Sequence, residues 1–359
     1  MNKREFLKTS LAAAGGLGLL SDGIASAFAE ESRKPAQSEN SSSGSVKINK
    51  REQLLSVLDQ SKPNKYVPAA FFMHFPEKFG EAAAKRHIDY FRATNMDIVK
   101  VQYEIFLPYL NFQKPEDWEK TPVYDTDFFE PVLSVIEYLA KELKREALII
   151  PTVYGTFSLA SQTSGRKLLE HAQENPDAVA KGIKKLTESL LNYAKEAVKR
   201  GADGFYYSTQ GGDSRNFAES ELFDTLIAQS DIAVLNGISD QTLLNILHIC
   251  DFAGPYNDIS KFRSHPASII NPPYALKDGT RISVKDVQKE FHRPVMGGLN
   301  RNGVISGGTF EQIAPEVDTL LRESSPNFIL AADCTVRAEW NVVREVIDYA
   351  HTWREKNAP

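Results

Sequence analysis

The sequence has little of what marks several large classes of protein. It has only two cysteines in 359 residues, so it is not a disulfide-stapled scaffold. No apolar run reaches the ~20 residues needed to cross a bilayer, so we expect no stable membrane span after processing. Basic clusters with interleaved aromatic residues are missing and the net charge is −5, so we expect no nucleic-acid partner.

The N-terminus has the pattern of an export signal. Lys3-Arg4 is followed by a weakly apolar Ala/Gly/Leu run and by the cleavage-like triplet AFA at 27–29. The Lys-Arg pair resembles the twin-arginine signal with lysine in place of the first arginine, which leaves general secretion open as the route. We expect residues 1–29 to be a signal peptide and the protein to be periplasmic, with an uncleaved anchor as the alternative.

A polar segment separates this signal from the folded part. Residues 30–45 are rich in Ser, Glu, Asn, Lys and Pro and lack apolar periodicity, which predicts a disordered linker. About 310 residues remain over 46–359, enough for one large domain with a well-buried core.

Short apolar runs alternate with amphipathic stretches in this domain, which is typical of βα units and a parallel sheet. The amphipathic stretches predict helices over 81–94, 128–145, 177–200, 310–323 and 339–354, with a loop and a short helix over 252–267. The apolar runs predict eight strands over 67–73, 98–101, 147–153, 204–207, 244–249, 268–271, 295–299 and 328–331. We therefore predict an α/β fold with a single (β/α)8, or TIM, barrel.

Such a barrel carries its chemistry at the carboxyl ends of its strands. The side chains at or just beyond these ends are His74, Glu104, Tyr154, Tyr207, Gln210, His248, Cys250, Asn271, Asn300 and Cys334. His248 and Cys250 are two residues apart, so they face the same side of a strand. One imidazole and two thiols suit Zn²⁺ and leave a coordination position open, as in catalytic zinc sites. We predict zinc at His248, Cys250 and Cys334, with a disulfide between the cysteines as the alternative.

Several sequence blocks resemble the uroporphyrinogen decarboxylase superfamily, and within it the cobalamin-dependent methyltransferase branch. The blocks are MDIVKV at 96–101, GADG at 201–204, LHIC at 247–250, PVMGGL at 294–299 and DCTV at 333–336. In that branch the His-x-Cys block and the later cysteine bind zinc. The resemblance implies an enzyme that moves a methyl group between a corrinoid or other methyl donor and a zinc-activated thiol. Its implied partners are a small-molecule thiol or methyl donor and, as one option, a corrinoid protein.

The decarboxylases of this superfamily are metal-free and hold their substrate's carboxylates with an arginine-rich loop after the first strand. The corresponding segment here, 71–78, reads FFMHFPEK and has no arginine. This disfavours porphyrin decarboxylation because the carboxylates would lose charge-assisted partners. For decarboxylation, arginines from other loops near the predicted mouth of the barrel would have to bind the substrate's carboxylates. The candidates in loop-like stretches are Arg215, Arg263, Arg281, Arg293 and Arg301.

Four further residues are candidates for catalysis. Glu104 follows the second strand, where the resemblance places the catalytic aspartate of the decarboxylases, and a buried carboxylate needs a partner. His74 is a candidate acid–base group. Tyr154 and Tyr207 are expected to line the pocket, with packing as the alternative.

Other residues receive weaker predictions. Gly297, Gly298 and Asn300 are candidates for cofactor binding, since glycine lets a ligand or a neighbouring backbone come close. The histidines expected to be solvated, on helices or at their edges, are His87, His171, His292 and His351.

Two other functions stay open. A metal-free decarboxylase or lyase acting on a tetrapyrrole or a smaller carboxylate would use Glu104 and His74 as acid–base groups. An exported, non-catalytic protein that binds a corrinoid, a tetrapyrrole or a metal would use the same pocket without turnover.

Overall fold

The computed structural model describes residues 49–62, 64–218 and 220–357, which form one structural unit. The signal peptide predicted over 1–29 and the linker predicted over 30–45 lie outside the described residues. Within those residues, no helix combines the length and the apolar character that a membrane crossing requires.

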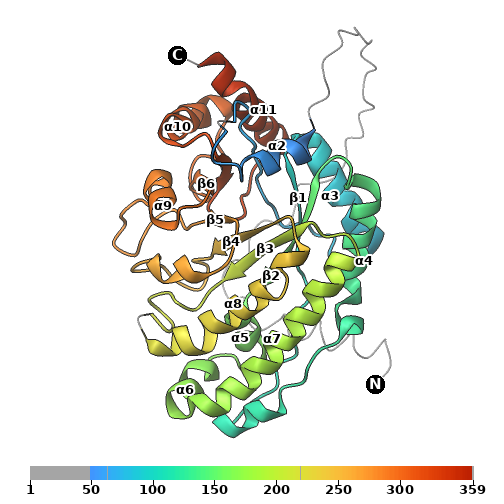
Figure 1. Ribbon diagram of the computed structural model, residues 1–359, viewed down its shortest axis with the longest axis vertical. Coiled ribbons are helices and arrows are strands. Elements are labelled where there is room, and N and C mark those ends of the chain that lie inside the picture. Colours follow the sequence, from blue (N-terminus) through green and yellow to red (C-terminus); the bar gives the residue numbers. More distant parts are fainter. Residues whose placement is uncertain (1–48, 63, 219, 358–359) are drawn as a thin grey trace, which may run out of the picture. The chain divides into compact units, whose positions relative to one another are not determined.

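Seven parallel strands form one curled sheet, and each strand pairs with the next one along the chain. The strands are apolar and buried on both faces, as is typical of a parallel sheet covered by helices. They are β1 (Ile98–Val101), β2 (Leu148–Tyr154), β3 (Gly204–Thr209), β4 (Leu244–Ile249), β5 (Ile269–Asn271), β6 (Val295–Leu299) and β7 (Phe328–Ala332). This is an α/β fold of the TIM-barrel type, with helices outside the strands (Figure 1).

The segment 67–73, predicted to be the first of eight strands, is not a regular strand. Ala69 forms one isolated parallel bridge with Leu330 of β7, and the Ala70 N–H donates to the Leu330 carbonyl at 2.9 Å. On its other side, the Asp97 N–H donates to the Ala69 carbonyl at 3.0 Å. The segment therefore lies between β7 and β1, but Pro68 has no N–H to extend the ladder.

Helices lie between the strands, as the apolar spacing of three and four residues predicts. Five predicted helices correspond to α3, α4, α7, α10 and α11, each within two residues at either end. The helices are α2 (Lys50–Ser56), α3 (Gly80–Thr94), α4 (Thr126–Leu143), α5 (Thr156–Ser164), α6 (Lys167–Glu174), α7 (Pro176–Lys199), α8 (Gln229–Asn236), α9 (Val284–Phe291), α10 (Phe310–Glu323) and α11 (Trp340–Lys356). Short helical turns are η2 (Pro115–Lys120), η3 (Phe223–Ala228), η4 (Ser239–Gln241) and η5 (Ser260–Ser264), the last within the predicted loop over 252–267.

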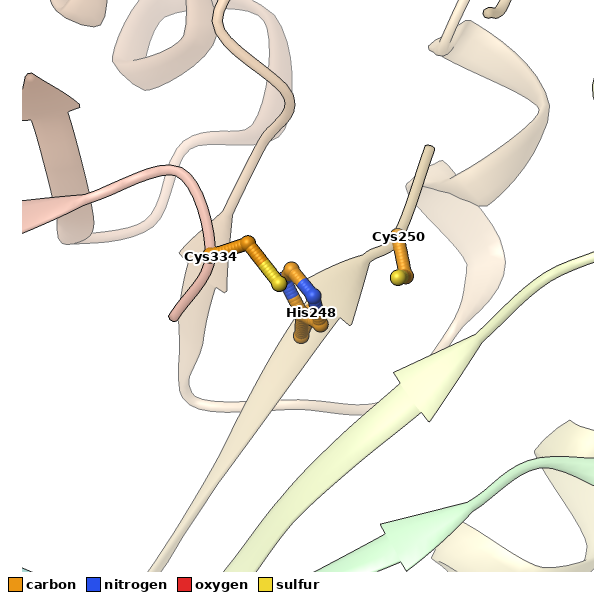
Figure 2. Close-up of side chains that lie close together, drawn as sticks. All are labelled: His248, Cys250 and Cys334. Carbon is orange, nitrogen blue, oxygen red and sulfur yellow. The ribbon is translucent and has the colours of Figure 1, made fainter. Parts of the chain in front are cut away.

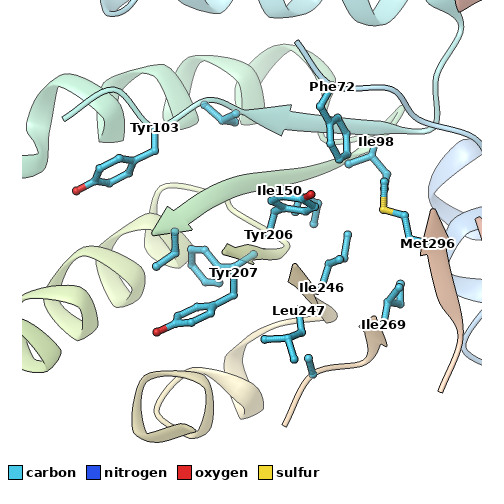
Figure 3. Packing of buried hydrophobic residues seen from close by; sticks show 14 of the residues in the cluster. Phe72, Ile98, Tyr103, Ile150, Tyr206, Tyr207, Ile246, Leu247, Ile269 and Met296 are labelled. Atoms are coloured by element: carbon cyan, nitrogen blue, oxygen red, sulfur yellow. The ribbon is translucent and has the colours of Figure 1, made fainter. Parts of the chain in front are cut away.

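The strand register sets which side chains share a level on the inner face of the sheet. One level across β2 to β5 consists of Thr152, Tyr206, Ile246 and Ile269. The next level toward the carboxyl ends consists of Tyr154, Ser208, His248 and Asn271. Figure 3 shows the apolar packing that surrounds the lower level. The carboxyl ends of the strands thus hold a polar level above an apolar core.

Three of the four histidines predicted to be solvated are buried. His87, His171 and His351 are 4%, 1% and 8% exposed, and only His292 is exposed. They do lie on helices, but on the faces that pack inward. His351, for example, hydrogen-bonds through Nε2 to the buried carboxylate of Asp97 at 2.8 Å. A histidine with such a partner is stable inside a protein, which the helical spacing alone does not reveal.

Candidate active site

His248, Cys250 and Cys334 converge at the carboxyl ends of the strands. His248 lies in β4, Cys250 is the first residue after β4, and Cys334 is the second residue after β7. Their ligand atoms lie within 4.8 Å of one another, and Figure 2 shows the three side chains near the ends of their strands. The Cys250 N–H donates to the Thr209 carbonyl at 3.0 Å, which continues the β3–β4 ladder and holds the backbone at Cys250 in place.

His248 is a buried imidazole whose two ring nitrogens lack hydrogen-bond partners within the described residues. The residue is 2% exposed, and its ring stacks on Tyr206 with centroids 4.8 Å apart and an interplanar angle of 25°. Leaving a buried polar group unpaired costs about 1–3 kcal/mol. The imidazole is therefore placed to bind a group that supplies the missing partner.

Both cysteines are free thiols, so the disulfide alternative does not describe this structure. Hydrogen bonding with Cys250 and the nearby His248 hold the pKa of the Cys334 thiol well below its usual range. The same interaction and burial raise the pKa of Cys250, whose sulfur also accepts a hydrogen bond from Gln210 Nε2 at 3.3 Å. The two sulfurs therefore interact with each other, and a metal that binds both as thiolates would displace their protons.

This donor set fits Zn²⁺. A tetrahedral ion with Zn–S near 2.3 Å and Zn–N near 2.0 Å places the two sulfurs about 3.8 Å apart and the nitrogen about 3.5 Å from each sulfur. The three ligand atoms lie within 4.8 Å of one another, so no pair has to approach by more than about 1.3 Å. Three protein ligands also leave the fourth position open.

Tyr206, not Tyr207, lies beside this cluster. Its hydroxyl donates to Asn271 Oδ1 at 2.5 Å, and Asn271 Nδ2 donates to the carbonyls of Met296 and Ala332 at 2.8 and 3.2 Å. The ring that supports His248 is therefore tied to β5, β6 and the end of β7.

Tyr207, a predicted pocket residue, has the opposite orientation. It is fully buried, and its hydroxyl donates to Asp231 Oδ1 of α8 at 2.7 Å. Since neighbouring residues of a strand point to opposite faces, Tyr207 packs against the helical layer while Tyr206 faces inward. Tyr207 therefore has the packing role that was its alternative, and the neighbouring Tyr206 lies beside the cluster instead.

Lys100 of β1 is a buried cation near the two cysteines. It is 9% exposed, and its Nζ lies over the rings of Phe72 and Tyr206, 5.2 and 5.3 Å from their centroids. Burial lowers its pKa to about 8, while Cys334, Glu104 and Cys250 act in the opposite direction. The ammonium therefore lies within electrostatic reach of both the thiols and Glu104.

Glu104 and His74, two predicted catalytic residues, contact each other. His74 Nδ1 lies 3.1 Å from Glu104 Oε1, and Lys78 Nζ lies 2.9 Å from Glu104 Oε2. The Glu104 side chain is 9% exposed, whereas those of His74 and Lys78 are 44% and 43% exposed. Burial opposes ionisation, but the two partners outweigh it and lower the pKa of Glu104. The carboxylate is therefore ionised at neutral pH.

Tyr154 ends β2 on the same level as His248. Its ring packs edge-to-face on Tyr103, with centroids 5.6 Å apart. Burial raises the pKa of its hydroxyl, and Cys250 and Glu104 add to this. Tyr154 therefore stays protonated at neutral pH, so its hydroxyl can act as a hydrogen-bond donor or acceptor but not as an anion.

The three predicted cofactor-binding residues have local structural roles. A Cβ on Gly298 would lie 2.3 Å from Leu320 Cδ2, so this glycine lets α10 pack closely on β6. A Cβ on Gly297 would lie 3.3 Å from Asn271 Nδ2. Asn300 accepts a hydrogen bond from the Asn302 N–H at 2.9 Å and stabilises its own loop.

Two residues of the site, Tyr206 and Lys100, were not predicted from the sequence. Lys100 carried a signal, because a lysine inside the apolar run IVKV must have a special environment. Tyr206 carried none, since β3 is buried on both faces and offers no alternation from which to tell its inner side.

Comparison with known proteins identifies the family. The family model of uroporphyrinogen decarboxylase (URO-D) matches residues 91–353, and the chain therefore belongs to this family. The structure is similar to a methyltransferase from Methanosarcina mazei, with a TM-score of 0.70 and 17% identity, over 86% of this chain and 99% of that one.

It is also similar to a B12-independent methionine synthase from Shewanella sp. W3-18-1 in complex with selenomethionine. The TM-score is 0.50 at 13% identity, over 82% of this chain and 94% of that one. At such identities the likeness establishes a shared fold. Sequence comparison with curated proteins gives no match.

Proposed function

We propose that this protein is a zinc-dependent methyltransferase that moves a methyl group between a methyl donor and a zinc-held thiol. The observation that carries the proposal is the buried His248, with two unpaired ring nitrogens, beside two free thiols whose ligand atoms lie within 4.8 Å. Membership of the uroporphyrinogen decarboxylase family and the fold shared with a methyltransferase support it.

His248, Cys250 and Cys334 would hold the metal, and Zn²⁺ bound there would keep a substrate thiol deprotonated at neutral pH. In the transfer, a sulfur lone pair attacks the methyl carbon and forms the S–C bond. The donor leaves with the electron pair of its broken bond to the methyl group. The thiol proton passes to a base or to solvent when the thiol binds.

Lys100 would compensate the charge of the bound substrate. Two protein thiolates neutralise the divalent ion, so a third thiolate gives the site a net negative charge. The Lys100 ammonium interacts with both cysteines and lies among rings that exclude water. In Lys100→Met, binding of the substrate thiol should weaken more than the turnover of bound substrate slows. KM should therefore rise by a larger factor than kcat falls.

Glu104 and His74 are the proposed proton-transfer pair, and Tyr154 a hydrogen-bond donor. Glu104 is ionised at neutral pH and touches His74, whose partly exposed ring can pass a proton to solvent. Tyr154 is within electrostatic reach of both Glu104 and Cys250.

The methyl donor is proposed to be a corrinoid, free or carried by a protein. We also propose that the chain is exported to the periplasm and cleaved near Ala29. An exported enzyme needs a donor present outside the cytoplasm, so free methylcobalamin is the probe of choice. N-terminal sequencing of the protein from a periplasmic fraction tests the export, and an intact N-terminus in the cytoplasm would refute it.

The decisive experiment combines metal content with methyl transfer. The export-processed protein, purified without chelator, should hold about one zinc per chain. It should demethylate methylcobalamin in the presence of a panel of small thiols, seen as the spectral change of the corrinoid. Cys250→Ser and Cys334→Ser should abolish both. His292→Asn is the matched control, because it changes an exposed histidine with φ of 53°, a conformation that asparagine tolerates.

Metal-free decarboxylation gives the opposite results. Formation of coproporphyrinogen from uroporphyrinogen under anaerobic conditions, unaffected by chelator and by Cys334→Ala, would refute the proposal. Zinc binding without turnover of either substrate would instead point to a binding protein.

A further inference from the structure

An arginine connects the two loops that carry the cysteines. Asp251 directly follows Cys250, and Asp333 directly precedes Cys334. Arg301 Nη1 lies 2.7 Å from Asp251 Oδ1 and 2.5 Å from Asp333 Oδ2. A single guanidinium nitrogen thus contacts the sequence neighbours of both thiols.

The three charged residues come from the ends of three different strands. Asp251 lies just past β4, Arg301 past β6 and Asp333 past β7. The Arg301 N–H also donates to Asp333 Oδ1 at 2.6 Å, and the Asp333 N–H donates to the Leu299 carbonyl at 3.0 Å. The arginine therefore has its backbone and its side chain fixed on the same carboxylate.

These contacts are shielded from water. The side chains of Arg301, Asp251 and Asp333 are 19%, 20% and 4% exposed. Asp333 accepts charge-assisted hydrogen bonds from Arg301, whereas the contact of Arg301 with Asp251 is an ion pair. Both kinds of contact are stronger in such surroundings than on an open surface.

We infer that Arg301 is a positioning residue that sets the separation of the Cys250 and Cys334 thiols for metal binding. The inference rests on the proposed metal site. Arg301 contacts neither sulfur, but each aspartate it holds is one peptide away from a cysteine. Partners hydrogen-bonded directly to a metal ligand typically contribute about 10- to 100-fold to metal affinity. Arg301 acts one residue away from each ligand, so its contribution should be at or below the lower end of that range.

The test is the zinc affinity of Arg301→Gln, measured by competition with a chromophoric chelator. We expect an affinity up to about 10-fold below that of the wild type, the lower end of the effect of direct partners. Co²⁺ substitution gives a second readout, because the intensity of the thiolate-to-cobalt charge-transfer band reports how many thiolates bind. That band should weaken in Arg301→Gln and partly recover in Arg301→Lys, which keeps the charge but not the planar fork.

Arg263→Gln is the matched control, since Arg263 pairs with Glu290 of α9 and neither residue adjoins a cysteine. Asp251→Asn serves if Arg301→Gln does not fold, because it cuts only the connection to β4 and should give a smaller loss. The inference would be overturned if Arg301→Gln kept the zinc affinity and the band intensity of the wild type. If Arg301→Gln does not fold, the same result in Asp251→Asn would overturn it. An equal loss of affinity in Arg263→Gln would also overturn it. A wild-type protein that binds no zinc would instead refute the proposed function.

Discussion

Two buried histidines, each stacked on a tyrosine, lie in contrasting surroundings. His351 of α11 stacks on Tyr66 with centroids 4.4 Å apart, and His248 stacks on Tyr206 with centroids 4.8 Å apart, both at 25°. His351 Nε2 lies 2.8 Å from both Asp97 Oδ2 and the Tyr66 hydroxyl. His248 has no such partner among the described residues. Similar rings in similar burial therefore differ in whether their polar atoms are satisfied.

The difference follows the two ends of the strands. Asp97 precedes β1 and, with Tyr66 and His351, forms what we call the base cluster. Asp203 precedes β3 and is likewise paired, with Arg51 at 2.8 and 3.0 Å and with the Ile149 N–H at 2.9 Å. The mouth cluster, His248, Cys250 and Cys334, lies at the carboxyl ends.

This contrast teaches how to separate stability from function in such a fold. In the base cluster and around Asp203, the polar groups are paired with one another. In the mouth cluster, the ring nitrogens of His248 have no hydrogen-bond partner among the described residues, and in barrels of this type the carboxyl ends of the strands carry the active site. Mutations in the base cluster should therefore cost stability, and those in the mouth cluster should cost binding.

The largest effect is expected for Asp97→Ala. The carboxylate accepts hydrogen bonds from the Tyr66 hydroxyl at 2.7 Å and the Ala69 N–H at 2.8 Å, besides its contact with His351. Removing it leaves buried donors unpaired, and the free energy of unfolding should fall by about 3–5 kcal/mol. Urea unfolding measures this loss, and zinc bound per folded chain should not change. Asp89→Ala, at an exposed site of α3, is the control, and its free energy of unfolding should stay within about 0.5 kcal/mol of the wild type. A loss of stability in Asp97→Ala no larger than this would contradict the prediction.

The two histidines themselves give a matched pair of variants. Phenylalanine keeps the stacking in both places but removes the ring nitrogens. His351→Phe should lower the free energy of unfolding by about 1–3 kcal/mol and leave zinc content intact. His248→Phe should leave the metal-free protein at least as stable as the wild type, because no hydrogen bond is lost, and should abolish zinc binding. Metal-free unfolding curves and metal analysis together test the pair, and equal losses of stability would remove the distinction between the two ends.

How far the sequence predicted these features depended on local spacing. His248 and Cys250 could be placed together because a separation of two residues keeps one face of a strand, whichever face that is. For Tyr207 the sequence leaves pocket lining and packing as alternatives, because it does not show which face of the strand the side chain takes. Because β3 is buried on both faces, its residues do not alternate between apolar and polar, and the sequence does not show which of them face inward. A shift of one residue therefore exchanges Tyr207 for Tyr206.

Other features depend on contacts that are distant in sequence. The prediction of a strand over 67–73 was wrong, because this segment forms only a single bridge, between Ala69 and Leu330. The burial of His351 depends on Asp97, 254 positions away. Gly298 has no room for a side chain because Leu320 of α10 packs against it, and the residues around Gly298 do not predict this contact.

The smallest effect on stability is expected for the carboxylate of Glu104, at the mouth of the barrel. The partners of Glu104 are nearly half exposed, whereas those of Asp97 are buried. Lys78→Met removes one of the interactions that lower the pKa of Glu104, so this pKa should rise toward its ordinary value. A folded-state pKa below the unfolded one stabilises the protein above the unfolded value of about 4.3. That contribution is lost as the pH falls through the folded-state pKa. The stability advantage of the wild type over Lys78→Met should therefore be full at pH 7 and disappear in acid.

Carbon-13 NMR titration of the Glu104 carboxyl and urea unfolding at pH 7 and in acid measure both parts of this prediction. Lys85→Met is the control, because Lys85 pairs with the exposed Glu81 within α3 and its loss should not move the Glu104 titration. Exposed partners are screened by water, so the advantage at pH 7 should be at most about 1 kcal/mol, below the losses expected for Asp97→Ala and His351→Phe. A pH-independent difference between wild type and Lys78→Met would mean that the lysine acts through packing and not through the charge of Glu104.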